Sequence, residues 1–136
     1  MTVALNPYIS FRDNARAAMT FYQDVFGGDL ALSTFGEFGD KDAAEAELIM
    51  HASLTTPDGL QLMGADTPPG MEFAAPSGIT VSLSGDDDKL REWFEKLAEG
   101  GEVSMPLEKQ MWGDEFGMVT DRFGTPWMVN VAAAQG

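Results

Sequence analysis

The sequence contains no cysteine and one histidine among its 136 residues. Without cysteine, disulfides, thiol nucleophiles and thiolate metal sites are excluded. A metal site that depends on His51 would have to draw its other ligands from residues other than histidine and cysteine. No stretch approaches the roughly 18 consecutive apolar residues of a membrane span, and the first ten residues lack the pattern of a signal peptide.

Basic residues are also scarce. Lysine and arginine number 8 against 22 aspartates and glutamates, which gives a formal net charge of −14. Such a surface repels phosphate backbones and anionic lipids, so we expect binding neither to nucleic acid nor to membranes. Hydrophobic residues make up 44% of the chain, enough for a real core. We therefore expect one cytoplasmic domain over residues 1–136, the size of an ordinary domain.

The first half of the chain predicts a strand, a helix and three further strands. The helix has an apolar stripe, Asp13 or Asn14 as its N-cap, and Gly27-Gly28 as its stop. A proline- and glycine-rich stretch over residues 67–77 follows and predicts a linker. The predicted elements are a strand at 3–11, a helix at 13–28, and strands at 30–38, 47–56 and 60–66.

The second half repeats this order. One alignment of the halves places Phe21-Tyr22 on Trp93-Phe94, and another places Gly59 on Gly124 and Met63 on Met128. The pattern indicates an internal repeat of a β-α-β-β-β unit, with module one at about 1–66 and module two at about 78–136. In module two we predict a strand at 78–85, a helix at 86–101, and strands at 102–112, 115–121 and 125–131.

Four segments of this tandem arrangement resemble the vicinal-oxygen-chelate superfamily, and within it the PhnB-like proteins: "NPYISF", "FYQDVFGG", "LMGAD" and "WGDEFGMVTDRFGTPWMVNV". That superfamily includes glyoxalases, extradiol dioxygenases, and fosfomycin and bleomycin resistance proteins. The resemblance implies an α+β fold in which two tandem β-α-β-β-β modules form a cupped, eight-stranded mixed sheet with the helices outside. It also implies a homodimer.

The superfamily's metal enzymes carry histidine or glutamate at four points that face the cup. The resemblance places these points on Asn6, Met63, Gly78 and Met128. An amide, two thioethers and a glycine are poor ligands for Zn, Fe(II), Mn or Ni. We therefore expect no metal and no cofactor. Met63 and Met128 would instead form an apolar pocket floor, with core packing as the alternative.

The resemblance also indicates which residues face the helix in the first strand of each module. Ile9 and Phe11 in module one would face the helix, as would Ile79, Val81 and Leu83 in module two. In the strand at 47–56, Ile49, His51 and Ser53 share a mixed face opposite a wholly apolar one. A mixed face is typical of a side that meets water and ligand, so we predict that His51 faces the ligand.

His51 is the one candidate for catalysis, as general base or hydrogen-bond acceptor, with a structural hydrogen-bonding role as the alternative. Trp127 is predicted to lie in the core, whereas Trp112 would wall the pocket or seal the dimer interface. Phe116 is a further candidate for the pocket wall. The expected pocket consists of Asn6, Tyr8, His51, Met63, Met128, Asn130 and Trp112.

Three classes of function fit this sequence. The first is a PhnB-like protein that binds an unknown small organic ligand without the usual divalent metal. The second is a glyoxalase-like lyase or isomerase, or a dioxygenase-type enzyme, with relocated ligands or with His51 as general base. The third is a scaffold without a ligand. The sequence does not decide whether the protein is an enzyme, and it does not identify the ligand.

Overall fold

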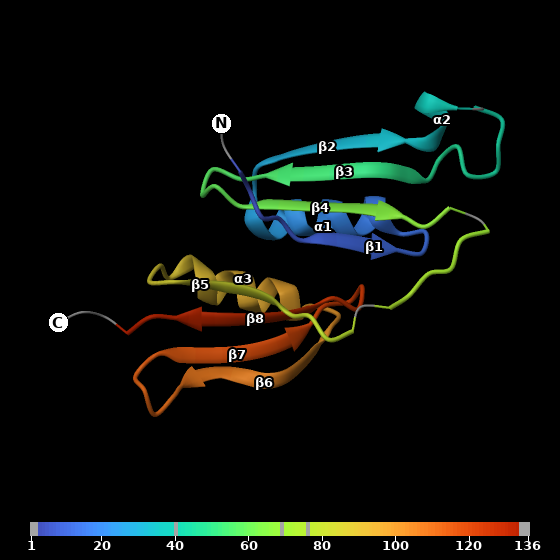
Figure 1. Cartoon of the computed structure of the whole chain (residues 1–136). Coiled ribbons are helices and arrows are strands. Elements are labelled where there is room, and N and C mark those ends of the chain that lie inside the picture. The colour runs from blue at the N-terminus through green and yellow to red at the C-terminus, as the bar shows by residue number, and fades with distance from the viewer. Residues whose placement is uncertain (1–2, 40, 69, 76, 134–136) are drawn as a thin grey trace. The chain divides into compact units, whose positions relative to one another are not determined.

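The structure is a computed structural model that describes residues 3–39, 41–68, 70–75 and 77–133. The chain divides into two compact units, Met1–Ala75 and Pro76–Gly136, and the boundary falls inside the predicted linker at 67–77. Each unit has the element order β-α-β-β-β, with one additional short helix in the first (Figure 1). This order confirms the predicted repeat and the α+β class, while the expectation of one domain stays a prediction.

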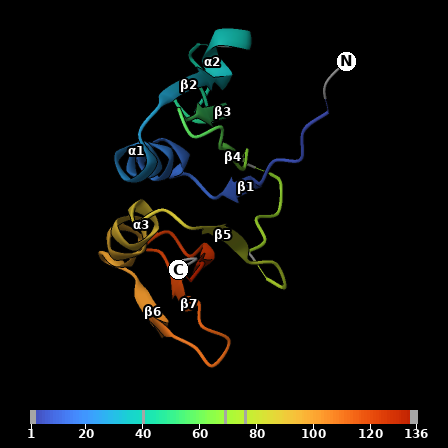
Figure 2. The same cartoon turned by 90° about the vertical axis from the view of Figure 1, so that its left-hand side faces the viewer.

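The first unit is a four-stranded mixed sheet with a helix on one face. The strand order is β1-β4-β3-β2, with β1 parallel to β4 and the other pairs antiparallel. Helix α1 packs on β2, β3 and β4 and lies on one side of the sheet in both views (Figures 1 and 2). The elements are β1 (Tyr8–Phe11), α1 (Ala15–Phe26), β2 (Asp29–Thr34), α2 (Phe35–Phe38), β3 (Ile49–Thr55) and β4 (Gln61–Asp66).

Helix α1 forms because its apolar residues recur every three or four positions and can be buried together against the sheet. It ends as predicted at Gly27, whose φ of 76° is accessible to glycine and whose N–H donates to the Gln23 carbonyl at 2.7 Å. Asn14, one of the two predicted N-cap residues, occupies the N-cap position but makes no side-chain cap hydrogen bond. The buried residues of α1 are Ala15, Ala18, Met19, Tyr22, Val25 and Phe26.

The buried carboxylate of Asp66 serves the start of α1 instead. Its Oδ1 accepts a hydrogen bond from the Ala15 N–H and its Oδ2 accepts one from the Ile49 N–H, both at 2.8 Å. A residue at the end of β4 thus satisfies the first turn of α1 and the first residue of β3 together. A carboxylate is favourable there because it meets the positive end of the helix dipole.

Two strands of the first unit are shorter than predicted. The strand expected at 3–11 begins at Tyr8, and the strand expected at 30–38 ends at Thr34. Beyond Thr34 the chain turns into the short helix α2, because the N–H groups of Phe35 and Gly36 donate to carbonyls of the loop before β3. Backbone hydrogen bonds to the loop before β3 therefore override the strand pattern of "LALSTFGEF".

Part of the predicted linker belongs to the first unit. The hydroxyl and the N–H of Thr67 both donate to the Phe11 carbonyl at 2.8 Å. The Arg12 guanidinium lies 5.2 Å from the ring centroid of Phe73, a cation–π contact. These contacts explain why the first unit extends to Ala75 rather than ending with β4.

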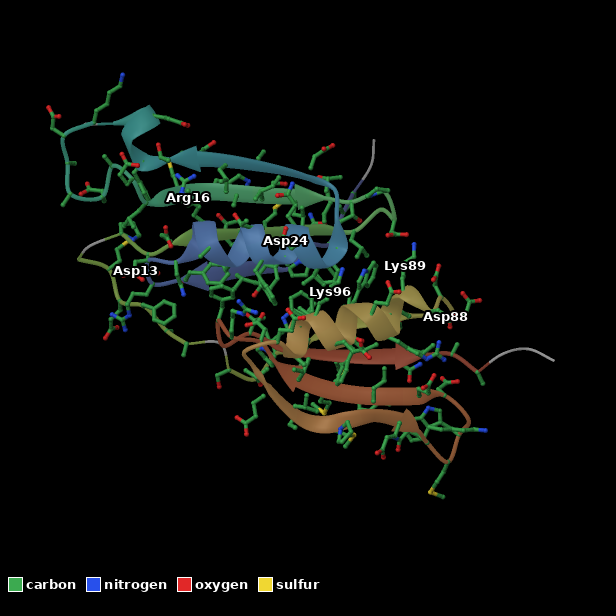
Figure 3. All side chains as sticks on the ribbon, turned by 180° about the vertical axis from the view of Figure 1, so that it is seen from behind. Asp13, Arg16, Asp24, Asp88, Lys89 and Lys96 are labelled. Carbon is green, nitrogen blue, oxygen red and sulfur yellow. The ribbon has the colours of Figure 1, made fainter. Side chains whose placement is uncertain are left out.

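The second unit repeats the architecture of the first. Its strand order is β5-β8-β7-β6, with β5 parallel to β8, and α3 packs against all four strands. The predicted stripe of Leu90, Trp93, Phe94 and Leu97 is buried, whereas charged residues such as Lys96 are exposed on the helix (Figure 3). The elements are β5 (Val81–Gly85), α3 (Lys89–Ala98), β6 (Glu102–Lys109), β7 (Glu115–Thr120) and β8 (Pro126–Val131).

The turn before β8 is held by the buried carboxylate of Asp121. Its Oδ1 accepts from the N–H groups of Phe123 and Thr125, and its Oδ2 accepts from Nε1 of Trp127 at 2.8 Å. Trp127 is 2% exposed, which confirms its predicted place in the core. The corresponding turn of the first unit is built around Thr56, whose hydroxyl accepts from the Leu60 N–H at 3.1 Å.

The predicted helix-facing residues are correct in module one and partly wrong in module two. Ile9, Phe11 and Leu83 are buried. Ile79, however, is 78% exposed, because β5 begins only at Val81, which is half-buried. Gly78, one of the four points suggested for metal ligands, also lies before this strand.

Candidate functional site

In the first unit, the candidate residues lie on the face of the sheet opposite α1. Tyr8 on β1 is the register partner of Met63 on β4, which in turn pairs with Ser53 on β3. Their strand neighbours Ile9, Leu62 and Leu54 are buried on the helix side. Because side chains alternate along a strand, Tyr8, Met63 and Ser53 form a row on the opposite face.

Tyr8 and His51 contact each other on this face. The Tyr8 hydroxyl lies 3.2 Å from Nδ1 of His51, and the two ring centroids are 5.7 Å apart. Since Tyr8 occupies Nδ1, Nε2 is the ring nitrogen that can meet a ligand. If the phenol donates to Nδ1, Nε2 carries the proton and is a donor; if Nδ1–H donates to the phenol, Nε2 is an acceptor.

A bulge near His51 changes the predicted faces of β3. His51 pairs with Ser33, but the next pair of the β2–β3 ladder joins Thr34 to Ile49, so Met50 is the extra residue. Ile49 is consequently buried at 1% exposure, and its predicted place beside His51 is wrong. His51 and Ser53 are half-buried, and Ala52 and Leu54 are buried as expected.

In the second unit, the corresponding face carries three methionines in one row. Met128 on β8 pairs with Met118 on β7, which pairs with Met105 on edge strand β6. The neighbours Val119 and Val129 are buried on the helix side. Met118 and Met128 are half-buried and Met105 is 40% exposed. We call Met105, Met118 and Met128 the methionine row.

Asn130 and Phe116 form the next row of the same face. Nδ2 of Asn130 donates to Oδ2 of Asp114 at 3.0 Å, and Oδ1 of Asp114 accepts from the Ala133 N–H at 2.8 Å. These hydrogen bonds, the Asn130 one foremost, hold the pKa of Asp114 below its ordinary value. Because a carboxylate only accepts, it fixes Nδ2 of Asn130 and leaves Oδ1 as the free acceptor of that amide.

Trp112 lies in the turn between β6 and β7. Its ring packs edge-on against Phe116 with centroids 6.4 Å apart, and its side chain is 62% exposed. Phe116 thereby links Trp112 to the row of Asn130. Of the seven predicted pocket residues, Tyr8, His51 and Met63 lie together in unit one, and Met128, Asn130 and Trp112 in unit two. Asn6 is half-buried in the segment before β1.

The sequence prediction missed several residues of these two faces. Met118 alternates with Gly117 and Val119 in "GMV", so strand periodicity alone could have placed it beside Met128. Asp114 carries no such signal, because its role depends on a loop that returns to Asn130. Met105 also carried no clear signal, since two register irregularities in β6 place it opposite Met118.

Comparison with known proteins defines the class. A family model described as Glyoxalase/Bleomycin resistance protein/Dioxygenase superfamily matches residues 4–129. The chain therefore belongs to this superfamily, which confirms the predicted relationship. It is 33% identical to Protein YjdN of Escherichia coli (strain K12), over 96% of this chain and 97% of that protein.

Solved structures agree with this assignment. Protein PA1353 from Pseudomonas aeruginosa is 37% identical with a TM-score of 0.87, covering 98% of this chain and 100% of that chain. A structure from Bacillus cereus titled as a putative 3-demethylubiquinone-9 3-methyltransferase, PhnB protein, has a TM-score of 0.75 at 24% identity, covering 96% and 100%. The second likeness shows the shared fold.

The donor chemistry does not fit the divalent metal of the superfamily's metal enzymes. Asn6, Met63 and Met128 offer one weak amide oxygen and two soft thioethers at the expected points, and Gly78 offers no side chain. Within the described ranges, no three histidine, cysteine, aspartate or glutamate side chains are grouped so that they could hold a metal ion. Nor does any helix in that part of the chain have the length and apolarity to cross a membrane.

Proposed function

We propose that the protein is a cytoplasmic, PhnB-like binding protein that holds a small organic molecule on a sheet face turned away from the helices. The observation that carries this proposal is the contact between Tyr8 and His51. This contact joins two polar side chains on the sheet face opposite α1, whereas a histidine of the core would point towards the helix.

The chemistry around His51 supports an uncharged, hydrogen-bonding ligand. Ser33 on β2 is the register partner of His51, and Ser53 lies two residues further along β3. Ser10 follows Tyr8 on the same face of β1. Hydroxyls and a neutral imidazole can both donate and accept, so they can recognise carbonyl, hydroxyl or amide groups. Few, well-placed polar groups on an otherwise apolar surface are typical of small-molecule sites.

A metal-free mode of binding follows from the donor set described above. The polarizable side chain of Met63, the register partner of Tyr8, would contact apolar parts of the ligand, and the Tyr8–His51 pair would orient its polar part. Binding would therefore depend on shape and hydrogen bonds, and would not require a chelating group on the ligand.

The alternative is an enzyme in which His51 acts as general base. The observation that favours it is the same hydrogen bond: when Nδ1–H donates to the phenolic oxygen, Nε2 is left as a proton acceptor towards the ligand. In that case Tyr8 would select the tautomer, and a bound carbon or oxygen acid would lose its proton to Nε2. Consumption of an identified ligand, abolished by His51→Gln, separates this function from binding alone.

A thermal-shift screen of small organic molecules tests the proposal directly. A ligand at 100 times its Kd should stabilise the protein by roughly 2.7 kcal/mol. Tyr8→Phe and His51→Gln should weaken that effect, whereas Asp24→Asn on the exposed side of α1 should not. Stabilisation that is unchanged in both site variants would overturn the assignment of the site.

We also propose a homodimer. Each four-stranded sheet has two edge strands, β1 and β2 in one and β5 and β6 in the other. Exposed strand edges carry unpaired backbone groups that have to be covered or paired. Light scattering should therefore give a mass of two 14.7 kDa chains at micromolar concentration, and a monomer mass would contradict the proposal.

A further inference from the structure

The methionine row lies on the face of the second sheet opposite α3. Its three members come from adjacent strands and are direct register partners, so their side chains are cross-strand neighbours. Two of them are half-buried and Met105 is 40% exposed. Three thioethers side by side form a flat, apolar and polarizable surface.

Aromatic side chains border this surface. Phe116 lies next to Met118 on the same face of β7, and Trp112 contacts Phe116 from the adjoining turn. Thioether sulfur makes favourable contacts with aromatic rings, and aromatic rings pair with one another in offset or edge-on arrangements. The methionine row with its aromatic border therefore suits a planar aromatic group.

The charges around the row exclude an anionic partner. The register places Lys109 opposite Glu115, and Glu115 receives the Arg91 Nε hydrogen bond at 2.8 Å from α3, so this cluster belongs to the helix side. The row itself is flanked on β5 by Ser82, the register partner of Met128. The register places Glu108 opposite Phe116 on this face, so with a net charge of −14 on the chain an anion would meet repulsion here.

Asn130 adds one polar requirement. Asp114 engages its Nδ2, which leaves Oδ1 as an acceptor one row from the methionines. A ligand that covers the methionine row can satisfy this oxygen with an N–H or O–H group at the edge of its ring. Buried acceptors without partners are costly, so this contact would discriminate between otherwise similar rings.

From these four observations we infer that the methionine row binds a planar aromatic group that has no negative charge and carries a hydrogen-bond donor at its edge. This inference rests on the proposed function and names the class of ligand. Met105, Met118 and Met128 provide the seat, and Asn130, held by Asp114, selects the donor.

Two naphthalene fluorophores test the charge and shape requirements. 1-Anilinonaphthalene is neutral and carries an N–H donor, and 8-anilinonaphthalene-1-sulfonate adds a sulfonate to the same molecule. The neutral probe should bind with a blue-shifted emission, and the sulfonate should bind at least about tenfold more weakly. Equal or tighter binding of the sulfonate would overturn the inference.

Three variants test the location. Met118→Ser should weaken binding of the neutral probe about tenfold, while the matched control Met111→Ser, at a fully exposed position outside the row, should leave it within about twofold. Met105→Lys should improve binding of the sulfonate. Equal effects of Met118→Ser and Met111→Ser on binding of the neutral probe would contradict the location of the site on the methionine row.

Methyl-labelled methionine spectra provide a readout that does not depend on a folding defect. The neutral probe should shift the methyl signals of the methionine row and leave that of buried Met19 in α1 unchanged. A probe that shifts the His51 imidazole signal but none of the three row methyls would overturn this inference while leaving the proposed function standing. If the neutral probe shifts the methyl signals of the methionine row while no ligand shifts the His51 imidazole signal, the result would support aromatic binding at the row and contradict the proposed function.

Discussion

Tyr8 and His51 are 43 residues apart in the sequence, yet the phenolic hydroxyl lies 3.2 Å from the imidazole Nδ1. The register brings them together: Tyr8 on β1 pairs with Met63 on β4, and β4 pairs with β3, which carries His51. The contact joins the first and third strands of the sheet order across β4, on the face opposite α1.

Replacing Tyr8 with phenylalanine should change the tautomer of His51. The hydrogen bond between the phenol and Nδ1 favours one tautomer of the imidazole. Tyr8→Phe removes this bond and should therefore move the ring towards the tautomer mixture of a free histidine. Long-range nitrogen–proton spectra of the single histidine measure this directly. Nitrogen shifts that are identical in the variant and the parent protein would show that the hydrogen bond does not set the tautomer.

His51→Ala should cost little stability. The imidazole is half-buried and its partner Tyr8 is 51% exposed, so water can replace the lost hydrogen bond. We expect a loss below about 1 kcal/mol in the urea unfolding free energy, against about 1–3 kcal/mol for a buried group left unsatisfied. A loss at the upper end of that range would favour a structural role for His51.

Asp121→Ala should cost much more. The carboxylate accepts from two backbone N–H groups and from the Trp127 indole, and the substitution leaves these donors buried without it. We expect a loss of about 3 kcal/mol or more, because each unsatisfied donor costs about 1–3 kcal/mol. Asp24→Ala, at an exposed position, is the matched control. Equal urea midpoints for the two variants would contradict the role of Asp121.

Asp66→Ala should destabilise the first unit through two elements at once. The Ala15 and Ile49 N–H groups both lose their acceptor, so the start of α1 and the start of β3 should open together. We expect a loss of about 2–4 kcal/mol. Hydrogen exchange should accelerate at both amides; acceleration at only one of them would show that Asp66 does not couple the two elements.

Asn130→Ala should raise the pKa of Asp114. In the parent protein, the hydrogen bond from Asn130 is the largest cause that holds this pKa below its ordinary value. Since the folded pKa is lowered, the carboxylate contributes stability above the pKa of the unfolded chain and loses it as the pH falls through the folded pKa. The variant should therefore show a higher Asp114 pKa in carboxyl NMR titrations and a weaker dependence of stability on acidic pH. An unchanged titration would contradict the proposed hydrogen bond.

Much of the fold follows from periodicity and glycine stops. The helix stripes, the Gly27-Gly28 stop and the paired turns at Gly59 and Gly124 are local signals, and the structure confirms them. The errors arise where tertiary hydrogen bonds decide. Examples are the cap of α1 by Asp66 and the turn at Phe35, which depend on residues far along the chain.

The candidate site was predictable to the extent that strand alternation applies. Tyr8, Met63, Met128 and Asn130 lie on the faces opposite the helices, as alternation requires. The bulge beside His51 broke that rule for Ile49, because an extra residue shifts which side chains point to the same face. Asp114 and Met105 enter through loop geometry and register shifts, which no local pattern encodes.

The imidazole signal of His51 offers the most direct test of small-molecule binding at this face. Because the chain has one histidine, its Cε1–H group gives a single resonance that can be followed through pools of small organic fragments. We predict that uncharged fragments with hydrogen-bonding groups shift this resonance in a saturable manner, and that Tyr8→Phe weakens their binding. A resonance that no fragment shifts at millimolar concentration would contradict the proposal that His51 and its sheet face bind a small molecule.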